Sequence, residues 1–173
     1  KSGLKLPAGV KTGEKILMFL ENKTGKAAGV TDFNLLSIPY RAVATDINTG
    51  KAVVIGSGNL ATAMRASMAI PGAFTPVDID GKLLVDGGMV NQVPVDVVRA
   101  MGADIVIAVD VGTPLGEIDS TTNLLKIADQ VIGFLTVGNT EDTIAALRKQ
   151  DILIRPELGS EVSTTSFEKE KIE

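Results

Sequence analysis

Three consecutive residues, Asp86, Gly87 and Gly88, have the clearest potential for chemistry in this sequence. The apolar residues 83–85 come before the aspartate, and Pro94 starts a predicted helix a few positions later. A carboxylate at the end of a strand is held by a rigid sheet but lies outside the strand pairing, which is where α/β proteins often carry working groups. Asp-Gly is also common turn chemistry, since Asp tolerates a left-handed backbone and Gly supplies positive φ. From these residues alone a turn is the favoured interpretation, and a catalytic carboxylate is the alternative.

The composition restricts the chemistry that is open to this carboxylate. The sequence contains no histidine and no cysteine, so it can form neither a Ser-His-Asp triad nor a thiolate nucleophile or thiolate metal site. Any acid–base catalysis must therefore use carboxylates, lysine or Tyr40, and nothing predicts a cofactor or a metal. The net charge of -4 and the lack of a basic run argue against a nucleic-acid partner. No apolar run reaches the ~18 residues of a membrane span, and no signal-peptide pattern opens the sequence. We expect a soluble protein, with a cytoplasmic and an exported location both open.

The elements that must position the carboxylate are those of an α/β fold. Hydrophobic residues make up 45% of the sequence but aromatic residues only 3%, which favours aliphatic strands flanked by helices. The patterns predict helices at 13–21, 60–70, 94–101, 123–137 and 141–150, and strands at 37–47, 51–55, 77–79, 82–85, 104–111 and 151–154. Turn residues at 48–50 and 80–81 indicate two hairpins. The nearly continuous apolar run 104–111 predicts a strand buried on both faces, forming a βαβ unit with strand 82–85.

The order of these segments resembles the bacterial patatin-like phospholipases. Three blocks carry the resemblance with matching spacing: residues 38–46 with Gly50, residues 65–74 with Pro76, and residues 80–110, which contain the LVDGG motif, Asn91 and the PVD motif. It extends over roughly residues 7–167. The resemblance implies a three-layer α/β/α fold with a central, mostly parallel sheet that is incomplete in this chain. Residues 1–173 would then be the C-terminal portion of a single catalytic domain.

The resemblance also implies a function. It indicates a lipid acyl hydrolase of phospholipase A or esterase type that acts through a Ser-Asp dyad, with Asp86 as the base and Gly87, Gly88 and Asn91 in the supporting loop. The family's nucleophile elbow, G-x-S-x-G, and its glycine-rich oxyanion loop lie N-terminal to these blocks, and neither occurs in this sequence. We therefore expect the chain to be inactive alone and to pair with the N-terminal part of its own domain. The implied substrate is a phospholipid or another acyl ester; peripheral membrane contact and a homodimer stay open.

Without histidine, the carboxylate must take the proton of the serine hydroxyl directly. A water-exposed aspartate, with a pKa of about 3.9, is a poor base for an alcohol. We therefore expect Asp86 to be partly buried, with Leu84, Met89 and Val90 as apolar neighbours. The two glycines would let the serine approach without a blocking Cβ.

Two serines within the sequence are weak candidates for the nucleophile. Ser57 lies between a strand and a helix, but the elbow needs small residues two positions to either side, where Ile55 and Asn59 stand. A helix-entry turn capped by Asn59 is the favoured interpretation. Ser67 lies within a predicted helix, and we expect its hydroxyl to bond back to its own turn.

The other polar residues of the matching blocks have milder interpretations. Asn91 either pins the loop after Asp86 or simply favours a turn. Asp46 is predicted to initiate the turn at 48–50, and Asp110 to serve a turn rather than line a crevice. Arg65 is expected to be solvated rather than to pair with a carboxylate or a phosphate head group.

Two further interpretations remain beside the hydrolase. The chain could be a non-catalytic α/β lipid-binding or interaction module that lacks the nucleophile. A nucleotide-binding protein is less favoured, because no G-x-x-x-x-G-K or G-x-G-x-x-G pattern follows a strand. The apolar segment 131–135 favours an ordinary core helix over a contact with a bilayer.

Overall fold

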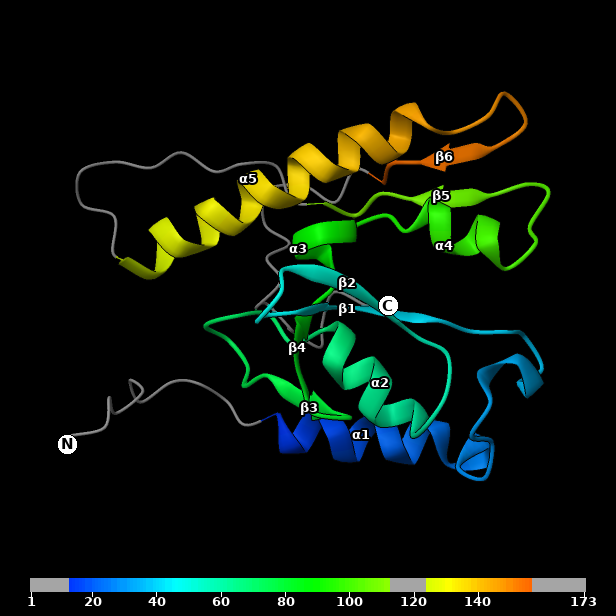
Figure 1. Ribbon diagram of the computed structural model, residues 1–173, viewed down its shortest axis with the longest axis vertical. Coiled ribbons are helices and arrows are strands. Elements are labelled where there is room, and N and C mark those ends of the chain that lie inside the picture. The colour runs from blue at the N-terminus through cyan, green and yellow to red at the C-terminus, as the bar shows by residue number, and fades with distance from the viewer. Residues whose placement is uncertain (1–12, 113–123, 157–173) are drawn as a thin grey trace.

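The computed structural model describes residues 13–112 and 124–156, which form two sheets and five α-helices (Figure 1). The strands are β1 (Ala42–Asp46), β2 (Lys51–Ile55), β3 (Val77–Ile79), β4 (Lys82–Asp86), β5 (Ile107–Val109) and β6 (Ile152–Ile154). The helices are α1 (Glu14–Thr24), α2 (Leu60–Ser67), α3 (Gly88–Asn91), α4 (Val95–Ala100) and α5 (Leu124–Ala145), with short 3-10 turns at Gly25–Ala27 and Phe33–Leu35. The predicted α/β class is confirmed. Helices α1 and α2 lie on one side of the larger sheet, and α3, α5 and the smaller sheet lie on the other.

The larger sheet has four strands in the order β2-β1-β4-β3, and every pair in it is antiparallel. Both predicted hairpins are confirmed. In the first turn, the Asp46 carboxylate accepts hydrogen bonds from the Asn48 backbone N–H (2.9 Å) and the Thr49 hydroxyl (3.0 Å), which is the turn role predicted for Asp46. In the second turn, Asp80 and Gly81 both adopt positive φ (53° and 75°), the backbone of a two-residue hairpin loop.

The core forms between this sheet and α2. Small side chains on both surfaces, including Ala42 and Ala44 on β1 and Ala63 and Ala66 on α2, are buried and bring the helix close to the sheet. The side chain of Asn59 accepts a hydrogen bond from the Thr62 N–H at 2.9 Å, so it caps α2 as predicted. This packing fixes the C-terminal end of α2 beside the end of β4.

The prediction of a mostly parallel central sheet is wrong for the larger sheet. Short hairpin loops connect β1 to β2 and β3 to β4, and such loops can join only antiparallel strands. The predicted βαβ unit is also wrong, because β1 and β3 already occupy both edges of β4. Strand β5 instead pairs in parallel with β6.

Burial of β5 on both faces, as predicted for the run 104–111, is also wrong. Ala108 is buried against Val93, Val95 and Val106, but Ile107 and Val109 are 61% and 49% exposed. The strand is shorter than predicted and has one apolar face without a cover among the described residues. Likewise β1 is shorter than the predicted strand 37–47.

Helix α5 is continuous, whereas two helices were predicted at 123–137 and 141–150. Gly138 lies inside the helix with open space around it, and one glycine costs only about 1 kcal/mol there. The hydroxyls of Thr136 and Thr140 bond back to the carbonyls of Gly133 (2.9 Å) and Thr136 (2.7 Å), so these residues stay compatible with helix. The helix ends at Ala145, and a short turn leads to β6.

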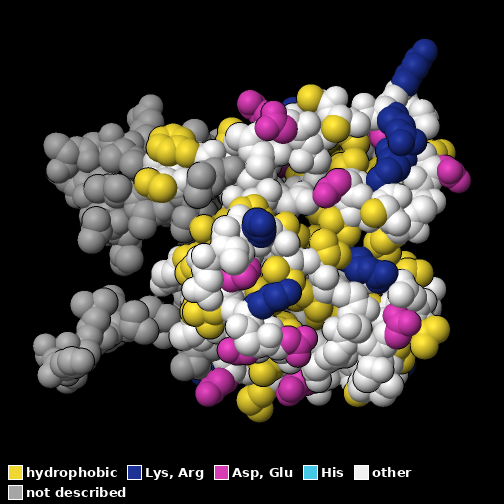
Figure 2. Space-filling view, in the orientation of Figure 1, with side chains coloured by type: hydrophobic (Ala, Val, Ile, Leu, Met, Phe, Trp, Pro, Cys, Tyr) yellow, Lys and Arg dark blue, Asp and Glu magenta, His cyan; other side chains and the backbone are white. Residues whose placement is uncertain are grey.

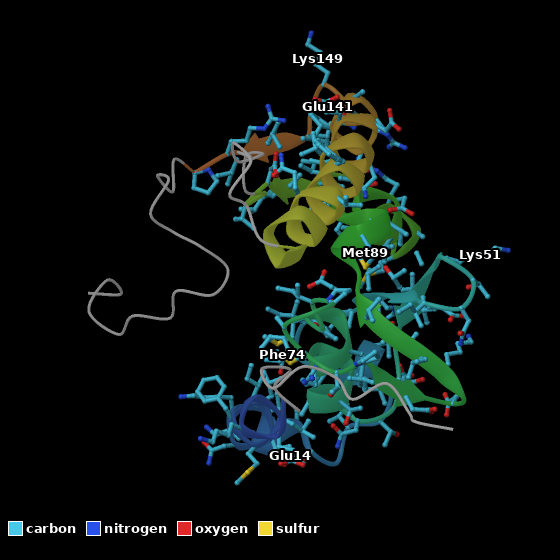
Figure 3. All side chains as sticks on the ribbon, turned by 90° about the vertical axis from the view of Figure 1, so that its left-hand side faces the viewer. Glu14, Lys51, Phe74, Met89, Glu141 and Lys149 are labelled. Atoms are coloured by element: carbon cyan, nitrogen blue, oxygen red, sulfur yellow. The ribbon has the colours of Figure 1, made fainter. Side chains whose placement is uncertain are left out.

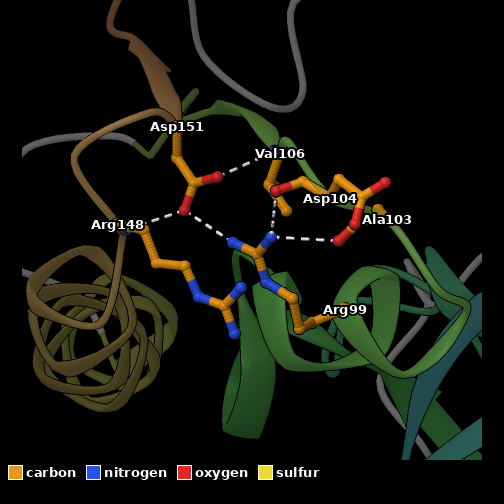
Figure 4. Close-up of polar contacts among 6 residues, drawn as sticks. All are labelled: Arg99, Ala103, Asp104, Val106, Arg148 and Asp151. Atoms are coloured by element: carbon orange, nitrogen blue, oxygen red, sulfur yellow. Dashed lines mark hydrogen bonds and ion pairs between the residues drawn. The ribbon is translucent and has the colours of Figure 1, made fainter.

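A buried ion pair connects α4 to the smaller sheet (Figure 4). Arg99 donates to Asp151 at 2.6 Å and to the carbonyls of Ala103 (3.0 Å) and Asp104 (2.9 Å). Asp151 also accepts from the backbone N–H groups of Val106 (2.9 Å) and Arg148. Its side chain is closed to solvent. Desolvation raises the pKa of Asp151, but the hydrogen bonds from Arg148, Arg99 and Val106 outweigh it and lower the pKa to about 2.

This carboxylate makes the stability of the protein sensitive to acid. Since the pKa of Asp151 is about 2 in the folded state and 3.8 ordinarily, its ionised form stabilises the fold fully above pH 4, and this contribution disappears as the pH falls toward 2. We expect Asp151→Asn to lower the melting temperature at pH 7 and to approach the wild type as the pH falls through this window. Thermal unfolding of the full-length protein between pH 7 and pH 2.5 measures this. A difference that stays constant with pH would contradict the assignment.

Candidate active site

Asp86 is the last residue of β4 and pairs with Ala44 of β1. Its backbone N–H donates to the carbonyl of Ala69 (3.0 Å), and its own carbonyl accepts from the Thr45 hydroxyl (2.8 Å). One carboxylate oxygen, Oδ1, accepts from the Gly88 N–H at 2.8 Å. The backbone of Asp86 is therefore held by β1 and by the segment that follows α2, and its carboxylate by the first residue of α3.

Packing against the backbone of β1, rather than its own backbone angles, requires glycine at position 87. Gly87 has an ordinary right-handed backbone (φ -69°, ψ -24°), so the positive φ of a simple Asp-Gly turn is not used here. A Cβ on Gly87 would lie 2.2 Å from the carbonyl oxygen of Val43. A Cβ on Gly88 would meet the side chain of Gln92 at 2.0 Å. At Gly87 only glycine lets the chain cross so close to β1.

An open pocket of about 250 Å³ lies beside the carboxylate. Its walls are residues 40–43 at the start of β1, Ser67 at the end of α2, residues 86–88, and Asn91, Gln92 and Pro94. All four residues predicted for the site, Asp86, Gly87, Gly88 and Asn91, thus meet at one pocket. The apolar neighbours predicted from the local sequence, Leu84, Met89 and Val90, do not line it.

The environment of Asp86 favours the protonated form more than water does. Burial raises the pKa of Asp86, and the hydrogen bond from the Gly88 N–H offsets part of this rise. No described residue forms an ion pair with it. A carboxylate with this combination binds a proton more readily than an exposed aspartate, which is the property that a general base for a hydroxyl needs.

Asn139 of α5 holds the loop after Asp86, and no local pattern in the sequence singled it out. Its Nδ2 donates to the carbonyls of Gly88 and Met89 (3.2 Å each), and its Oδ1 accepts from the Gln92 N–H at 3.1 Å. Figure 3 shows Met89 between the larger sheet and α5. This residue was missed because an asparagine inside a helix carries no signal of a partner about 50 residues away.

Asn91 joins α3 to α4. Its Nδ2 donates to the Asp96 carboxylate at 2.9 Å. Its Oδ1 is buried and has no hydrogen-bond partner among the described residues. The orientation of the amide follows from Asp96, because a carboxylate accepts hydrogen bonds and cannot donate them when ionised.

Neither serine that sequence analysis considered is placed as a nucleophile. Ser67 lines the pocket, but its hydroxyl donates to the carbonyl of Val43 at 2.6 Å. It is packed as predicted, although the partner is on β1 and not in its own helical turn. Ser57 is exposed, forms an isolated bridge with Asp32 and does not line the pocket.

The prediction that Arg65 is solvated is wrong. The residue is only 3% exposed, its guanidinium lies over the ring of Phe74, and it donates to the carbonyl of Thr75 at 3.1 Å. Burial lowers the pKa of Arg65. Phe74 lies toward the α1 side of the molecule, away from Met89 on α3 (Figure 3), and Arg65 does not line the pocket.

Asp110 has the turn role that was favoured. It accepts from the Gly112 N–H at 3.0 Å and forms an ion pair with Arg155 at 3.1 Å.

The prediction that segment 131–135 belongs to the core does not hold for its two described large side chains, since Val131 and Phe134 are 52% and 56% exposed. On the face shown in Figure 2, acidic and basic side chains are interspersed and hydrophobic ones reach the surface in several places. Within the described residues, no helix is both long and apolar enough to cross a membrane.

Comparison with known proteins places the chain in a family. Residues 11–99, just over half of the chain, match the family model described as patatin-like phospholipase. The chain is 43% identical over 102 residues to an NTE family protein of Mycobacterium tuberculosis, covering 59% of this chain and 27% of that protein. It is 46% identical over 101 residues to patatin-like phospholipase domain-containing protein 7 of Mus musculus, covering 57% of this chain and 7% of that protein. It is also 40% identical over 101 residues to protein 6 of the same name in Mus musculus, again covering 57% of this chain and 7% of that protein.

The chain belongs to the patatin-like phospholipase family. The matched residues include Asp86, Gly87 and Gly88, and membership supports a lipid hydrolase function in general terms. The chain spans about a quarter of the mycobacterial relatives and less than a tenth of the mouse relatives that it matches.

The close approach of Gly87 to β1 can be tested by adding one methyl group. We expect Gly87→Ala to lower the free energy of unfolding by about 1–3 kcal/mol, because the Cβ would overlap a backbone oxygen that cannot move alone. Gly138→Ala is the matched control, and it should raise that free energy by about 0.5–1 kcal/mol, since open space surrounds this helical glycine. Denaturant unfolding of the full-length variants measures both. Equal stabilities would show that the contact imposes no constraint.

Proposed function

We propose that this chain carries the base of a lipid acyl hydrolase of phospholipase A or esterase type. Asp86 accepts the proton of a serine nucleophile that lies on a segment outside this sequence. The observation that supports this most is a partly buried, unpaired carboxylate, fixed at the end of a strand, whose pKa is raised and which opens onto a pocket. Membership of the patatin-like phospholipase family supplies the reaction class.

The hydrogen bonds of Asp86 indicate which atom takes the proton. Oδ1 accepts from the Gly88 N–H, so Oδ2 is left for the serine hydroxyl. As the serine oxygen attacks the ester carbonyl carbon, its proton moves to Oδ2. Collapse of the tetrahedral intermediate breaks the bond to the alcohol, which takes the proton from Asp86 and leaves an acyl-serine. Water then attacks the acyl-serine, Asp86 again takes the proton and returns it to the serine, and the fatty acid leaves.

The smaller sheet supports the proposal that the rest of the catalytic domain packs against this chain. Parallel sheets are nearly always covered on both faces. In the parallel pair of β5 and β6, Ile107 stands beside Ile152 and Val109 beside Ile154, and all four side chains are exposed. We propose that the serine-carrying segment covers this aliphatic face, so that residues 1–173 are one portion of a single domain.

Replacement of the base tests the proposed reaction. We expect Asp86→Asn in the full-length protein to lower acyl-ester hydrolysis by about 10²- to 10⁴-fold, the usual contribution of a general base. Asp80→Asn is the control, because Asp80 is exposed in the β3–β4 turn and Asn tolerates its positive φ. Activity of the wild type should fall in acid as Asp86 is protonated, with a midpoint above the ordinary aspartate value of 3.8. Near-normal turnover of Asp86→Asn would overturn the assignment.

The stability of the same variant separates catalysis from folding. Because burial disfavours the charged carboxylate, the ionised group destabilises the fold above its raised pKa, and Asn can still accept from the Gly88 N–H. The variant should therefore melt at or above the wild-type temperature at pH 7, and the difference should shrink as the pH falls.

A fluorophosphonate probe should label a serine outside residues 1–173 in the wild type. Absence of labelling in folded full-length protein would favour the non-catalytic lipid-binding or interaction module.

Single cysteines test the covered face. In the native full-length protein, we expect cysteines at position 107 or 154 (Ile107→Cys, Ile154→Cys) to react with a maleimide at least about tenfold more slowly than one at the exposed position 149 (Lys149→Cys). All three should react equally after unfolding, with mass spectrometry of the peptides as the readout. Equal native rates would contradict the packing proposal, and so would protection that depends on protein concentration, because that result indicates a second copy as the cover.

A further inference from the structure

Arg41 is a half-buried cation on the wall of the Asp86 pocket. Its Nη1 donates to the carbonyl of Tyr40 at 2.7 Å, and its Nη2 donates to Oδ1 of Asn34 at 2.6 Å. Both acceptors are neutral, and no carboxylate of the described residues lies within ion-pair distance of it. A guanidinium has five N–H donors, so three remain for another acceptor. In a chain with net charge -4, a pocket cation without a counter-charge calls for an anionic ligand.

Neighbouring residues hold the Arg41 guanidinium in place without neutralising its charge. The Asn34 amide is oriented by Asp32, whose Oδ1 accepts from Asn34 Nδ2 at 2.8 Å and from the Asn34 N–H at 2.9 Å. This leaves Asn34 Oδ1 to face Arg41. On the other side, Gly56 makes room, since a Cβ there would lie 2.8 Å from Arg41 Nε and 3.0 Å from Cζ. A preorganised arginine loses little conformational freedom when it binds an oxyanion.

The spacing between Arg41 and Asp86 suits one ligand that spans both. Ala44 pairs with Asp86, and Arg41 comes three residues before Ala44. The backbone of Arg41 therefore lies roughly 10 Å from that of Asp86, measured along the strand direction. They line the same pocket without forming an ion pair. A phosphate at Arg41 and an ester carbonyl near Asp86 can therefore belong to one lipid, in which the glycerol carbons join them.

We propose that Arg41 binds the phosphodiester of a phospholipid substrate and so selects phosphate-bearing lipids over neutral esters. This inference rests on the proposed hydrolase function and assigns the head-group end of its pocket. Arginine is suited to the role, because its planar fork donates two parallel hydrogen bonds to phosphate oxygens. Arg65, the other arginine considered for a phosphate, is enclosed by Phe74 and Thr75 away from this pocket.

Two substrates that differ only in the head group test the assignment in the full-length protein. They are 1-palmitoyl-lysophosphatidylcholine, which carries a phosphodiester, and 1-palmitoylglycerol, which does not. We expect Arg41→Gln to lower kcat/KM for the phospholipid by about 10- to 100-fold, mainly through KM, the scale of a charged hydrogen bond to phosphate. Hydrolysis of palmitoylglycerol should stay within about twofold of wild type. Arg41→Lys keeps the charge but not the planar guanidinium, so its kcat/KM for the phospholipid should lie between those of the wild type and Arg41→Gln.

Controls separate this role from a structural one. Arg148→Gln removes an exposed arginine that does not line the pocket, and it should change the hydrolysis of neither substrate. Equal loss on both substrates by Arg41→Gln would overturn the head-group role. Inorganic phosphate should inhibit palmitoylglycerol hydrolysis by the wild type and not by Arg41→Gln. If the variant loses only this inhibition and keeps normal phospholipid hydrolysis, the site takes free phosphate and the proposed lipid contact is wrong.

Failure of the proposed reaction is distinguishable from failure of this inference. If the wild type hydrolyses neither substrate, the hydrolase proposal fails, and binding then tests Arg41 by itself. Hexadecylphosphocholine carries the phosphodiester but no ester, so it can be titrated calorimetrically without turnover. We expect Arg41→Gln to weaken its binding about tenfold or more, and equal affinity would overturn the assignment.

Discussion

A single carbonyl group, that of Val43, fixes where Asp86 stands. Gly87 passes so close to it that no side chain fits between the two backbones, and the Ser67 hydroxyl donates to the same oxygen. One atom of β1 thus contacts both the residue after the carboxylate and the end of α2. Since Ala44, the next residue of β1, pairs with Asp86 itself, the position of the carboxylate is set by main-chain geometry more than by side-chain packing. Main-chain contacts of this kind are stiff, and they preorganise a reactive group without using its own hydrogen-bonding capacity.

Two aspartates, one with its side chain closed to solvent and one partly buried, show how local donors decide the behaviour of a carboxylate. Asp151 is closed to solvent, yet hydrogen bonds from Arg99 and two backbone N–H groups outweigh its desolvation and keep it ionised. From the described residues, the carboxylate of Asp86 receives one backbone hydrogen bond and no ion pair, so burial dominates and raises its pKa. The carboxylate of Asp151 connects α4 to the smaller sheet. The carboxylate of Asp86 keeps one oxygen, Oδ2, that accepts no hydrogen bond from a described residue. The same residue type therefore serves structure in one place and suits proton transfer in the other.

The sequence predicted local structure well and long-range pairing poorly. Both hairpins, the Asn59 cap and the strand that ends at Asp86 depend on neighbours in the chain, and all were predicted. The partner of β5 was not, because pairing depends on which strand edges remain free, and β4 has none. One continuous helix was predicted as two, with a break at residues 138–140, which include Gly138 and Thr140. At the candidate site, the Asp-Gly-Gly segment was proposed from its residues and context, whereas the contacts of Asn139 and Arg41 and the burial of Arg65 depend on distant segments.

The hydrogen bonds of Asn139 give the molecule a mechanical connection. The amide of this one side chain holds the carbonyls of Gly88 and Met89 and the N–H of Gln92, and Gly88 in turn donates to the carboxylate of Asp86. Helix α5 is a stiff rod, and its turns before Asn139 present Val131 and Phe134 to the outside. The position of α5 and the orientation of the Gly88 N–H group are therefore linked by one side chain. The helix thus helps to orient the carboxylate of Asp86 without contacting it.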